Sequence, residues 1–310
     1  MESELLAWIR DRLPPHPQLR LGPGDDAAVL RLADGAECAV TVDLLTDGVD
    51  FRIGEVAPGR VGRKALAVSI SDIAAMAARP LAAVIALALP RRGGKQLAIG
   101  LYEGLIPLAE KYDMSIAGGD INSWDGPLAI STTVIGQITA RGPLCRHGAR
   151  PGDRIVVTGQ FGGSILGRHL DFDPRVDEAL WLTENYDLRA GIDVSDGLSL
   201  DLSRLAAESG CGAVIDLALV PVADAARELS RQQGATEAEL DSAALEHALS
   251  DGEDFELILA VAPEDAAQMI ADQPLSITLT DIGQFIDQHG LWQIDADGRR
   301  CPLEAKGYLH

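Results

Sequence analysis

Residues 63–78 read RKALAVSISDIAAMAA, an apolar stretch with one carboxylate, Asp72, inside it. The spacing of its apolar residues predicts a long helix over about 56–78, and the AAVIALALP that follows at 82–90 predicts a strand. An aspartate inside an apolar helix lowers helix propensity and costs desolvation energy. Its charge therefore needs a partner, which is either a metal ion or a salt bridge with Arg63 or Lys64, about two helical turns away.

The chain on both sides of this helix alternates expected strands and helices, which is typical of an α/β (α+β) fold. The first half contains expected strands over 26–32, 38–45, 114–118 and 128–139, and a helix over 95–112. The second half contains expected strands over 154–159, 190–193, 212–219, 255–261, 276–286 and 290–294, with helices over 163–170, 176–185, 198–209, 222–232, 240–249 and 263–272. Between the halves, the segment 141–159 is rich in glycine, proline and arginine and marks a junction. We therefore predict two domains, 1–147 and 148–310.

Composition excludes several classes of protein. The net charge of -21 disfavours binding to nucleic acid and to anionic lipid, both of which require lysine and arginine contacts. The sequence has no apolar run of about 18 residues that would span a membrane, and its acidic N-terminus does not resemble a signal peptide. Four cysteines without C-x-x-C spacing argue against a zinc site and a disulfide framework. We expect a cytoplasmic protein.

Aspartates recur where a strand or an apolar helix meets glycine or a small polar residue. They lie in GPGDDAAV, AVTVDLL, AVSISDIAAM, IAGGDINS and GIDVSDGL: Asp25, Asp26, Asp43, Asp72, Asp120, Asp193 and Asp196. Each one alone has a structural explanation, because aspartate is common in turns and caps helices well. Asp196 has such a competing role as N-cap of the helix over 198–209, where a phosphate would also be favoured. Taken together, the carboxylates indicate a site for Mg²⁺ or Mn²⁺, which select hard oxygen ligands.

Known phosphate-binding motifs are missing from the sequence. There is no G-x-x-x-x-G-K-[ST], and the glycine-rich VVTGQFGGSILG at 156–167 does not match G-x-G-x-x-G. Close packing is the better interpretation of this turn. What remains is a set of carboxylates, glycine turns and a few basic residues such as Lys64 and Arg146. This combination is typical of metal-assisted phosphoryl transfer, in which positioning and charge neutralisation do most of the catalysis.

Several segments, in order, resemble the thiamine-monophosphate kinase family, within the superfamily of aminoimidazole ribonucleotide synthetase. The matching segments are GPGDDAAVL, TVDLLTDGVDF, GRKALAVSISDIAAMAARP, GGD, GARPGDRIVVTGQFGGS, IDVSDGLSLDLSRLA and DGEDFELIL, which span about residues 21–260. The resemblance implies a two-domain fold like that of the synthetase, with an N-terminal mixed sheet that pairs in a homodimer and a C-terminal α/β domain. It also implies ATP bound near the dimer interface through several Mg²⁺ ions, and direct in-line transfer to thiamine monophosphate without a catalytic side chain or a phosphoenzyme.

The resemblance also assigns residues. It implies metal ligation by the seven aspartates above, of which Asp25 rather than Asp26 is the expected contact. It implies nucleotide binding by Tyr102, Gly119, Asp120, Arg146 and Ser195. It implies substrate binding by Asp50, Glu253 and Tyr308. Asp50 stands where the family usually has histidine (GVDF for GVHF). A carboxylate there would repel a substrate phosphate unless a metal lies between them.

Two further functions stay open from the sequence. One is another ATP-using member of the superfamily with a different acceptor: the synthetase itself, a selenophosphate synthetase or a hydrogenase-maturation protein. Cys38 lies within a strand pattern and Cys301 lies nine residues before the end of the chain, which disfavours the last two. The other is a non-catalytic nucleotide-binding protein, which would be expected to have lost the metal aspartates.

Overall fold

The computed structural model describes residue 5 and residues 8–33, 35–294 and 298–308 of the chain. The chain divides into two compact units, each with its own sheet. We call Pro15–Pro143 together with Leu170–Val176 the N-terminal unit. We call Met1–Pro14, Leu144–His169 and Asp177–His310 the C-terminal unit. The two sheets with their helices confirm the predicted mixed α/β class, whereas the boundary at 147/148 stays a prediction.

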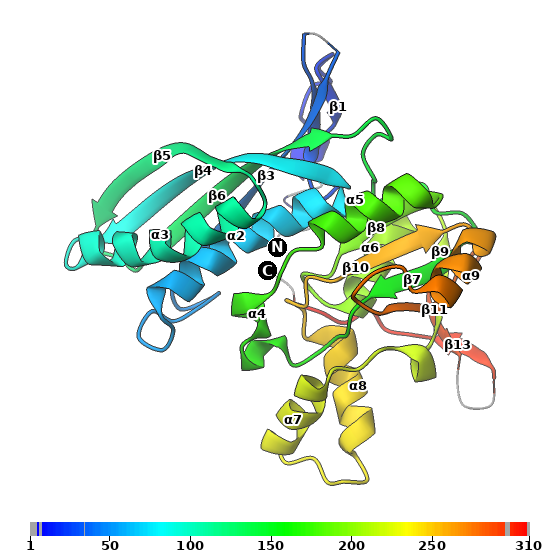
Figure 1. The fold of residues 1–310 in the computed structure, drawn as a ribbon. Coiled ribbons are helices and arrows are strands. Elements are labelled where there is room, and N and C mark those ends of the chain that lie inside the picture. The colour runs from blue at the N-terminus through cyan, green and yellow to red at the C-terminus, as the bar shows by residue number, and fades with distance from the viewer. Residues whose placement is uncertain (1–4, 6–7, 34, 295–297, 309–310) are drawn as a thin grey trace. The chain divides into compact units, whose positions relative to one another are not determined.

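The N-terminal unit consists of a six-stranded sheet and two long helices. Its elements are β1 (Leu19–Leu21), β2 (Ala28–Arg31), β3 (Glu37–Thr46), α2 (Pro58–Ala75), β4 (Ala78–Pro90), α3 (Gly94–Lys111), β5 (Ser115–Trp124) and β6 (Ala129–Ile138). The strand order is β1-β2-β3-β6-β4-β5, with β4 and β5 parallel and the other neighbours antiparallel. Both helices pack on one face of the sheet (Figure 1). The sheet therefore presents its other face without a covering helix from this unit.

Helix α2 confirms the predicted apolar helix but ends sooner. It begins at Pro58, whose fixed φ suits the first turn of a helix, and it ends at Ala75. Ala77 has a φ of 48°, in the left-handed region, so the chain turns at once into β4. As a result β4 begins at Ala78 and not at residue 82, where the apolar run alone placed it.

Strand β5 is longer than predicted. The expected strand ended at Gly118, because a Gly-Gly-Asp sequence favours a turn. In the structure β5 continues to Trp124 and pairs in parallel with β4 along its whole length. The ladder of hydrogen bonds to β4 outweighs the local turn preference, so Asp120 lies within a strand and not at its end.

The C-terminal unit contains a seven-stranded sheet and several shorter helices. Its strands are β7 (Arg154–Thr158), β8 (Leu188–Asp193), β9 (Gly212–Asp216), β10 (Leu257–Val261), β11 (Leu279–Ile286), β12 (Gly290–Ile294) and β13 (Arg300–Pro302). Its helices are η1 (Ser164–Leu166), α5 (Val176–Asn185), α6 (Leu198–Glu208), η2 (Leu217–Leu219), α7 (Asp224–Gln232), α8 (Leu240–Ser250) and α9 (Pro263–Asp272). Helix α4 (Arg168–Asp171) begins in this unit and ends in the N-terminal unit. The expected helix over 163–170 is thus broken at Gly167, whose φ is 135°.

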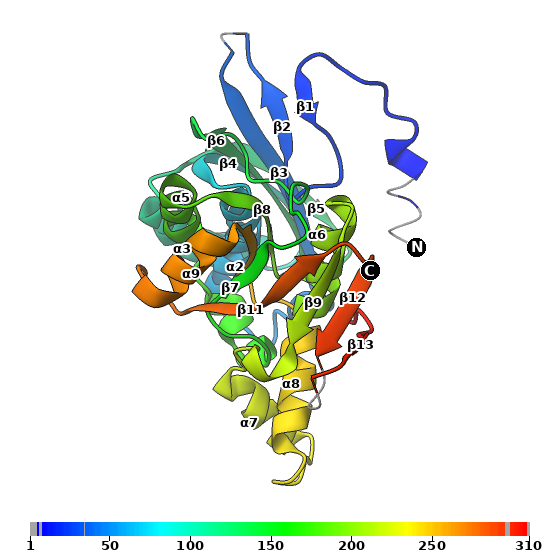
Figure 2. The same cartoon turned by 90° about the vertical axis from the view of Figure 1, so that its right-hand side faces the viewer.

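The sheet of the C-terminal unit has the order β13-β12-β9-β11-β7-β10-β8. Only β9 and β12 are parallel; the other neighbouring strands are antiparallel. Helix α6 packs against this sheet and contributes Leu198, Leu202 and Leu205 to a core in which these side chains are fully buried. Helices α7 and α8 lie side by side as a hairpin (Figure 2). Within the described part of the chain, none of the helices has the length and apolarity that crossing a bilayer requires.

Glycines allow α2 and α3 to approach each other very closely. A Cβ atom added to Gly62 would lie 2.0 Å from the Leu101 carbonyl oxygen, and one added to Gly104 would lie 1.7 Å from the Gly59 carbonyl oxygen. Real Cβ atoms do not approach backbone this closely, so the backbones of α2 and α3 touch directly. The contact with α3 fixes the position of α2, whose other side packs on β3, β6 and β4.

We predict that Gly62→Ala destabilises the protein by about 3 kcal/mol or more, because the new methyl group forces α2 away from α3. Urea unfolding followed by circular dichroism measures the change. The matched control is Gly59→Ala on the same helix, where the added Cβ would lie 3.5 Å from its nearest neighbour. That variant should keep its stability or gain up to about 1 kcal/mol. Equal losses in both variants would contradict the close-packing explanation.

Candidate functional site

The N-terminal unit places two of the predicted metal ligands on elements that pack together, β3 and α2. Asp43 lies on β3, and the hydroxyl of Ser69 on α2 donates a hydrogen bond of 2.6 Å to its carboxylate. The Ser69 hydroxyl also lies 2.7 Å from that of Thr132 on β6. Burial raises the pKa of Asp43. The hydrogen bond from Ser69 lowers this pKa, and the nearby charge of Asp50 raises it further. A cation beside Asp43 would therefore stabilise its charged form.

Asp72 is half-buried on α2 and faces β3. The hydroxyl of Thr41 on β3 donates to its carboxylate. The two basic residues weighed as its partners have contacts of their own: Arg63 pairs with Asp173 at 2.7 Å, and the Lys64 ammonium donates to the Asp50 carbonyl oxygen at 2.9 Å. Lys64 is 1% exposed, so α2 buries a positive charge that is held by the backbone of the turn after β3.

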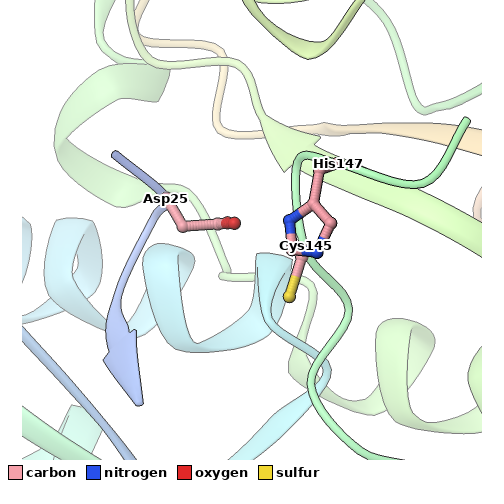
Figure 3. A group of neighbouring side chains, drawn as sticks. All are labelled: Asp25, Cys145 and His147. Carbon is pink, nitrogen blue, oxygen red and sulfur yellow. The ribbon is translucent and has the colours of Figure 1, made fainter. Parts of the chain in front are cut away.

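Asp25 and Asp26 lie in the turn before β2. Figure 3 shows the side chain of Asp25. Asp26 is buried, Asp25 is half-buried, and the Asp26 amide donates to the Asp25 carboxylate at 3.1 Å. Gly24, with a φ of 130°, supplies the backbone conformation that begins this turn. The adjacent carboxylates are thus held by local backbone geometry, as the Gly-Pro-Gly sequence before them indicated.

The predicted nucleotide contacts of this unit lie on α3 and on β5, the edge strand. Gly119 and Asp120 are exposed on β5, and a Cβ atom at Gly119 would lie 1.8 Å from the Ile85 carbonyl oxygen on β4. Glycine at this position is therefore required for the pairing of β4 with β5. Tyr102 on α3 lines an apolar cavity of about 810 Å³, whose wall also contains Leu89, Ile99, Ile106 and Ile121. The cavity has the size and the apolar lining of a small-molecule site.

Asp50, the predicted substrate residue of this unit, is engaged by its own turn. Its carboxylate accepts a hydrogen bond of 2.7 Å from the amide of Thr46, and the Thr46 hydroxyl lies 3.4 Å away. Its carbonyl oxygen accepts from Lys64. The carboxylate therefore stabilises the turn after β3, a role that the sequence comparison with histidine did not indicate.

In the C-terminal unit, Asp193 ends β8, and Ser195 and Asp196 lie on the loop between β8 and α6. Asp193 is 2% exposed at the end of β8. Asp196 is not the N-cap of α6, which corrects one interpretation from the sequence: the cap position is Gly197. The carboxylate of Asp201, in the first turn of α6, instead accepts the amides of Asp196 (2.9 Å) and Gly197 (3.1 Å). A residue inside the helix thus shapes the loop before it.

Asp201 and Arg204, both on α6, contact this loop, and the sequence interpretation missed them. Arg204 pairs with the carboxylate of Asp196 and, at 2.8 Å, with that of Asp201. The pKa of Asp201 is raised to about 7, first by burial and second by the charge of Asp196. The charge of Arg204 lowers this pKa. The spacing Asp201–Arg204 on a predicted helix was the available signal, because residues three apart share a helix face.

Arg146 lies on the extended segment between β6 and β7. Its positive charge acts on the pKa of Asp201, in the lowering direction, and its carbonyl oxygen accepts from the Ser209 hydroxyl at 2.9 Å. The neighbouring Cys145 and His147 are on the same segment (Figure 3). The C-terminal unit thus brings the predicted cation Arg146 to the same group of residues as Asp196 and its helix.

Both predicted substrate residues of the C-terminal unit contact the loop with Asp193. The amide of Glu253 donates to the Ser195 carbonyl oxygen at 2.7 Å, and that of Tyr308 donates to the Asp196 carbonyl oxygen at 2.9 Å. Tyr308 is 50% exposed, and Glu253 has a φ of 54°. Residues more than 50 positions apart in the sequence therefore converge on one loop.

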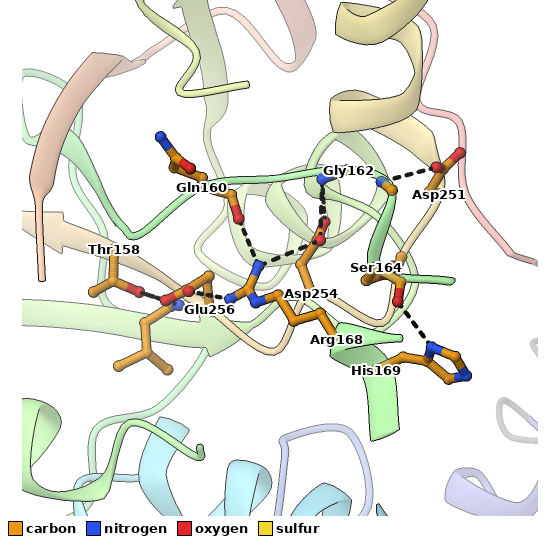
Figure 4. Close-up of polar contacts among 12 residues, drawn as sticks. Thr158, Gln160, Gly162, Ser164, Arg168, His169, Asp251, Asp254 and Glu256 are labelled. Carbon is orange, nitrogen blue, oxygen red and sulfur yellow. Dashed lines mark hydrogen bonds and ion pairs between the residues drawn. The ribbon is translucent and has the colours of Figure 1, made fainter. Parts of the chain in front are cut away.

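The glycine-rich turn over 158–164 confirms the close-packing interpretation. Cβ atoms added to Gly162 and Gly163 would lie 2.6 and 2.4 Å from the backbone of Ala248 and Ala225. The amides of the turn bind carboxylates of the chain itself: Gly162 donates to Asp254 at 3.0 Å and Gly163 to Asp251 at 3.2 Å (Figure 4). Side chains of this protein thus occupy the turn as a phosphate would occupy a phosphate-binding loop.

The chemistry of the carboxylates fits a hard divalent cation. Asp25, Asp26, Asp43, Asp72 and Asp120 belong to the N-terminal unit, and Asp193 and Asp196 belong to the C-terminal unit. Asp26 and Asp193 are buried, and burial disfavours the charge of Asp43. Carboxylate oxygens are the donors that Mg²⁺ and Mn²⁺ select, and such an ion would offset the cost of burying these charges.

Comparison with known proteins identifies both halves of the chain. The model of the AIR synthase related protein, N-terminal domain, matches residues 24–138, and that of the C-terminal domain matches residues 150–291. A thiamine-monophosphate kinase of Rhodopirellula baltica is 42% identical over 317 residues, which cover 100% of this chain and 97% of the relative.

Solved structures share the fold over nearly the whole chain. A structure described as AaThiL complexed with AMPPCP and TMP has a TM-score of 0.82 at 26% identity and covers 99% of this chain and 96% of that one. The thiamine-monophosphate kinase of Stenotrophomonas maltophilia K279a has a TM-score of 0.73 at 32% identity, with 95% and 96% covered.

We predict that Gly252→Ala disrupts the loop between β8 and α6. The new Cβ would lie 2.6 Å from the Ser195 carbonyl oxygen at a residue with a φ of 73°, so we expect a loss of roughly 2–5 kcal/mol in unfolding free energy. Gly210→Ala is the matched control, since its φ is 68° and no heavy atom lies within 4 Å of the added Cβ. It should lose only about 1–2 kcal/mol. Urea unfolding compares the two, and equal losses would show that the contact with Ser195 is unimportant.

Proposed function

The chain belongs to the thiamine-monophosphate kinase family of AIR synthase related proteins, and we propose that it transfers the γ-phosphate of ATP to the phosphate of thiamine monophosphate. The product is thiamine diphosphate. The observation that carries this proposal is the similarity over the full length to kinases of this name, at 42% identity, which includes both carboxylate-bearing units. A related fold in complex with AMPPCP, an analogue of ATP, and TMP supports it.

The apolar cavity beside Tyr102 is suited to the base of ATP. An adenine ring is flat and mostly apolar at its faces, so it can pack against Tyr102 and the aliphatic side chains of Leu89 and Ile121. Gly119 and Asp120 lie on β5, the strand that carries Ile121. In the C-terminal unit, Ser195 and Arg146 supply a hydroxyl and a guanidinium, groups that bind phosphate oxygens.

The carboxylates of both units would hold Mg²⁺ against the phosphates. The ligands we propose are Asp25, Asp43, Asp72, Asp120, Asp193 and Asp196, with Asp26 beside them. When bound, Mg²⁺ supplies electrostatic stabilisation of the charge on the transferred phosphoryl group. The hydroxyls of Ser69 and Thr41 orient the carboxylates of Asp43 and Asp72, and Arg204 with Asp201 orients Asp196. No side chain acts as a nucleophile in this mechanism, because positioning of the two phosphates is sufficient for in-line transfer.

The acceptor, thiamine monophosphate, would contact Asp50, Glu253 and Tyr308. The aromatic ring of Tyr308 is half exposed and available to pack against a thiamine ring. The two carboxylates suit the positive charge of the thiazolium ring better than they suit a phosphate. Asp50 would therefore contact the acceptor through its cationic ring or through a metal ion.

A different acceptor and a non-catalytic role are not favoured. Relatives at 30% identity or more that match the whole chain include thiamine-monophosphate kinases of Escherichia coli and Bacillus subtilis. None of the four cysteines, all of which lie in the described part of the chain, forms a disulfide. We propose a cytoplasmic location, since a reducing compartment keeps thiols free.

We propose that the protein is a homodimer that pairs through the sheet of the N-terminal unit. The open face of this sheet carries Val42 and Leu44 on β3 and Val84 on β4, which are 63%, 65% and 40% exposed. An apolar face of this kind is costly in water and is typical of a protein interface. A second copy of the same sheet offers a complementary apolar face.

We predict that the purified protein forms thiamine diphosphate from ATP, thiamine monophosphate and Mg²⁺, and that EDTA abolishes the reaction because the carboxylates then lack their cation. Asp193→Asn should lower kcat by a factor of about 100 or more, since one ligand charge is lost. Product is followed by chromatography with fluorescence detection.

The control for Asp193→Asn is Asp153→Asn, because Asp153 is similarly buried, at 3% against 2% exposed, and lies on the same unit outside the predicted site. It should lose stability and keep its turnover per folded molecule. Intact turnover in Asp193→Asn would show that the metal assignment is wrong. Failure of the wild type to form product, with ATP binding intact, would point to a different acceptor.

For the dimer, we predict that Leu44→Asp gives a monomer by light scattering, because it places charge in an apolar interface. The control is Leu219→Asp in the C-terminal unit, a site 47% exposed that should leave the mass unchanged. A wild-type protein that is monomeric at all concentrations would contradict the proposal.

A further inference from the structure

The loop Asp251–Glu256 joins α8 to β10 and borders the proposed site with its backbone. The amides of Glu253 and Phe255 donate to the carbonyl oxygens of Ser195 (2.7 Å) and Val194 (2.8 Å). The Val194 amide in turn donates to the Glu256 carbonyl oxygen at 2.8 Å. The position of this loop therefore sets the position of Ser195 and its neighbours.

The same loop is held on its other side by side chains. Asp254 and Glu256 are 0% and 1% exposed. The carboxylate of Asp254 accepts the Gly162 amide through both oxygens, at 3.0 and 3.1 Å, and that of Glu256 accepts the Thr158 hydroxyl at 2.7 Å (Figure 4). The loop is thus fixed between the glycine-rich turn over 158–164 and the loop that carries Ser195.

The backbone of this loop is strained at two positions. Glu253 and Phe255 have φ values of 54° and 50°, in the left-handed region that side chains other than glycine and asparagine rarely adopt. They alternate with Asp254 and Glu256, the residues whose carboxylates are anchored. Such strain persists only where the surrounding contacts enforce it. The contacts of the two carboxylates and the amide bonds of Glu253 and Phe255 to Ser195 and Val194 are the contacts that hold this conformation.

Arg168 is the cation shared by these two buried carboxylates (Figure 4). One of its terminal nitrogens pairs with Glu256, and the other lies 3.7 Å from Asp254 and donates to the Gln160 carbonyl oxygen at 2.8 Å. The pKa of Asp254 is raised to about 8, mainly because the group is buried. The charge of Arg168 lowers this pKa, and the charges of Glu256 and Asp251 raise it further. Without the guanidinium, two acidic groups two residues apart would share a desolvated space.

We propose that Arg168 is a positioning residue for the kinase reaction: its guanidinium bridges Asp254 and Glu256 and so holds Glu253 in the strained conformation from which it binds the acceptor. The proposal rests on the function proposed above, in which Glu253 contacts thiamine monophosphate. Arg168 itself acts through the loop. Because an arginine offers a planar fork that can reach two carboxylates, a point charge cannot replace it.

The test compares Arg168→Gln with Arg154→Gln in the full-length protein. Arg154 lies in the same unit, is 31% exposed against 32% for Arg168, and donates to the Asp281 carboxylate at 2.7 and 2.9 Å. Both variants lose an arginine–carboxylate pair, so both should lower Tm. Only Arg168→Gln should raise KM for thiamine monophosphate, by about tenfold, with a smaller change in kcat, because the acceptor contact is misplaced.

Amide hydrogen exchange provides a measurement that does not depend on activity. In Arg168→Gln, the amides of Glu253 and Phe255 should exchange faster, while those of β10 beyond Leu257 keep their protection. In Arg154→Gln, the amides of Glu253 and Phe255 and those of β10 should all keep their protection from exchange. If the wild type shows no kinase activity, the proposed function fails, and the exchange data still decide whether Arg168 positions the loop.

Two results would overturn the proposal. The first is a KM for thiamine monophosphate that is unchanged in Arg168→Gln or raised equally in Arg154→Gln. The second is faster exchange spread evenly over the loop and β10, which marks a general loss of stability. If Arg168→Gln does not fold, Arg168→Lys replaces it, since this variant retains the charge. Wild-type KM and wild-type protection in Arg168→Lys would overturn the bridging role.

Discussion

Burial of carboxylate charge is the constraint on which the rest of this structure depends. Three aspartates near the proposed site have a defined donor: Ser69 for Asp43, Thr41 for Asp72, and the backbone amides of Asp196 and Gly197 for Asp201. Such groups are costly to desolvate, and their hydrogen bonds offset part of the cost. These donors do not neutralise the carboxylates, so the negative charge remains. That charge suits a site for ATP bound with divalent cations.

The two units meet this constraint in different ways. In the N-terminal unit, neutral hydroxyls of Ser69 and Thr41 donate to the carboxylates of Asp43 and Asp72. The C-terminal unit relies on arginines: Arg204 at Asp196 and Asp201, and Arg168 at Asp254 and Glu256. Hydroxyl donors orient a carboxylate and leave its charge in place, whereas an arginine neutralises it. The first arrangement leaves the carboxylates of Asp43 and Asp72 charged for metal ligation. In the second, Arg168 and Arg204 hold loops, and Arg204 also orients Asp196.

The glycine-rich turn over 158–164 shows how a motif and its use can differ. Its sequence has the composition of a phosphate-binding loop, and its amides do bind anionic groups, yet those groups are the carboxylates of Asp251 and Asp254. The turn thereby anchors the loop that carries Glu253. The sequence shows that this turn lacks a phosphate-binding motif. It does not show that the turn binds Asp251 and Asp254, because these residues lie about 90 positions away.

The sequence by itself determined the elements and the kind of chemistry. The apolar period of residues 63–78 predicted α2, and the recurrence of aspartates at the ends of apolar segments predicted an acidic, metal-binding site. Only the tertiary structure decided how each carboxylate is held. Local preference placed the end of β5 at Gly118 and the cap of α6 at Asp196. In the structure, pairing with β4 extends the strand to Trp124, the cap position is Gly197, and Asp201 accepts the amides of Asp196 and Gly197. Asp50, Asp201, Arg168 and Arg204 acquire their roles from neighbours in space. Hydrophobic periodicity is a property of neighbouring residues in the chain, whereas the neutralisation of a buried charge depends on which distant side chain the fold brings to it.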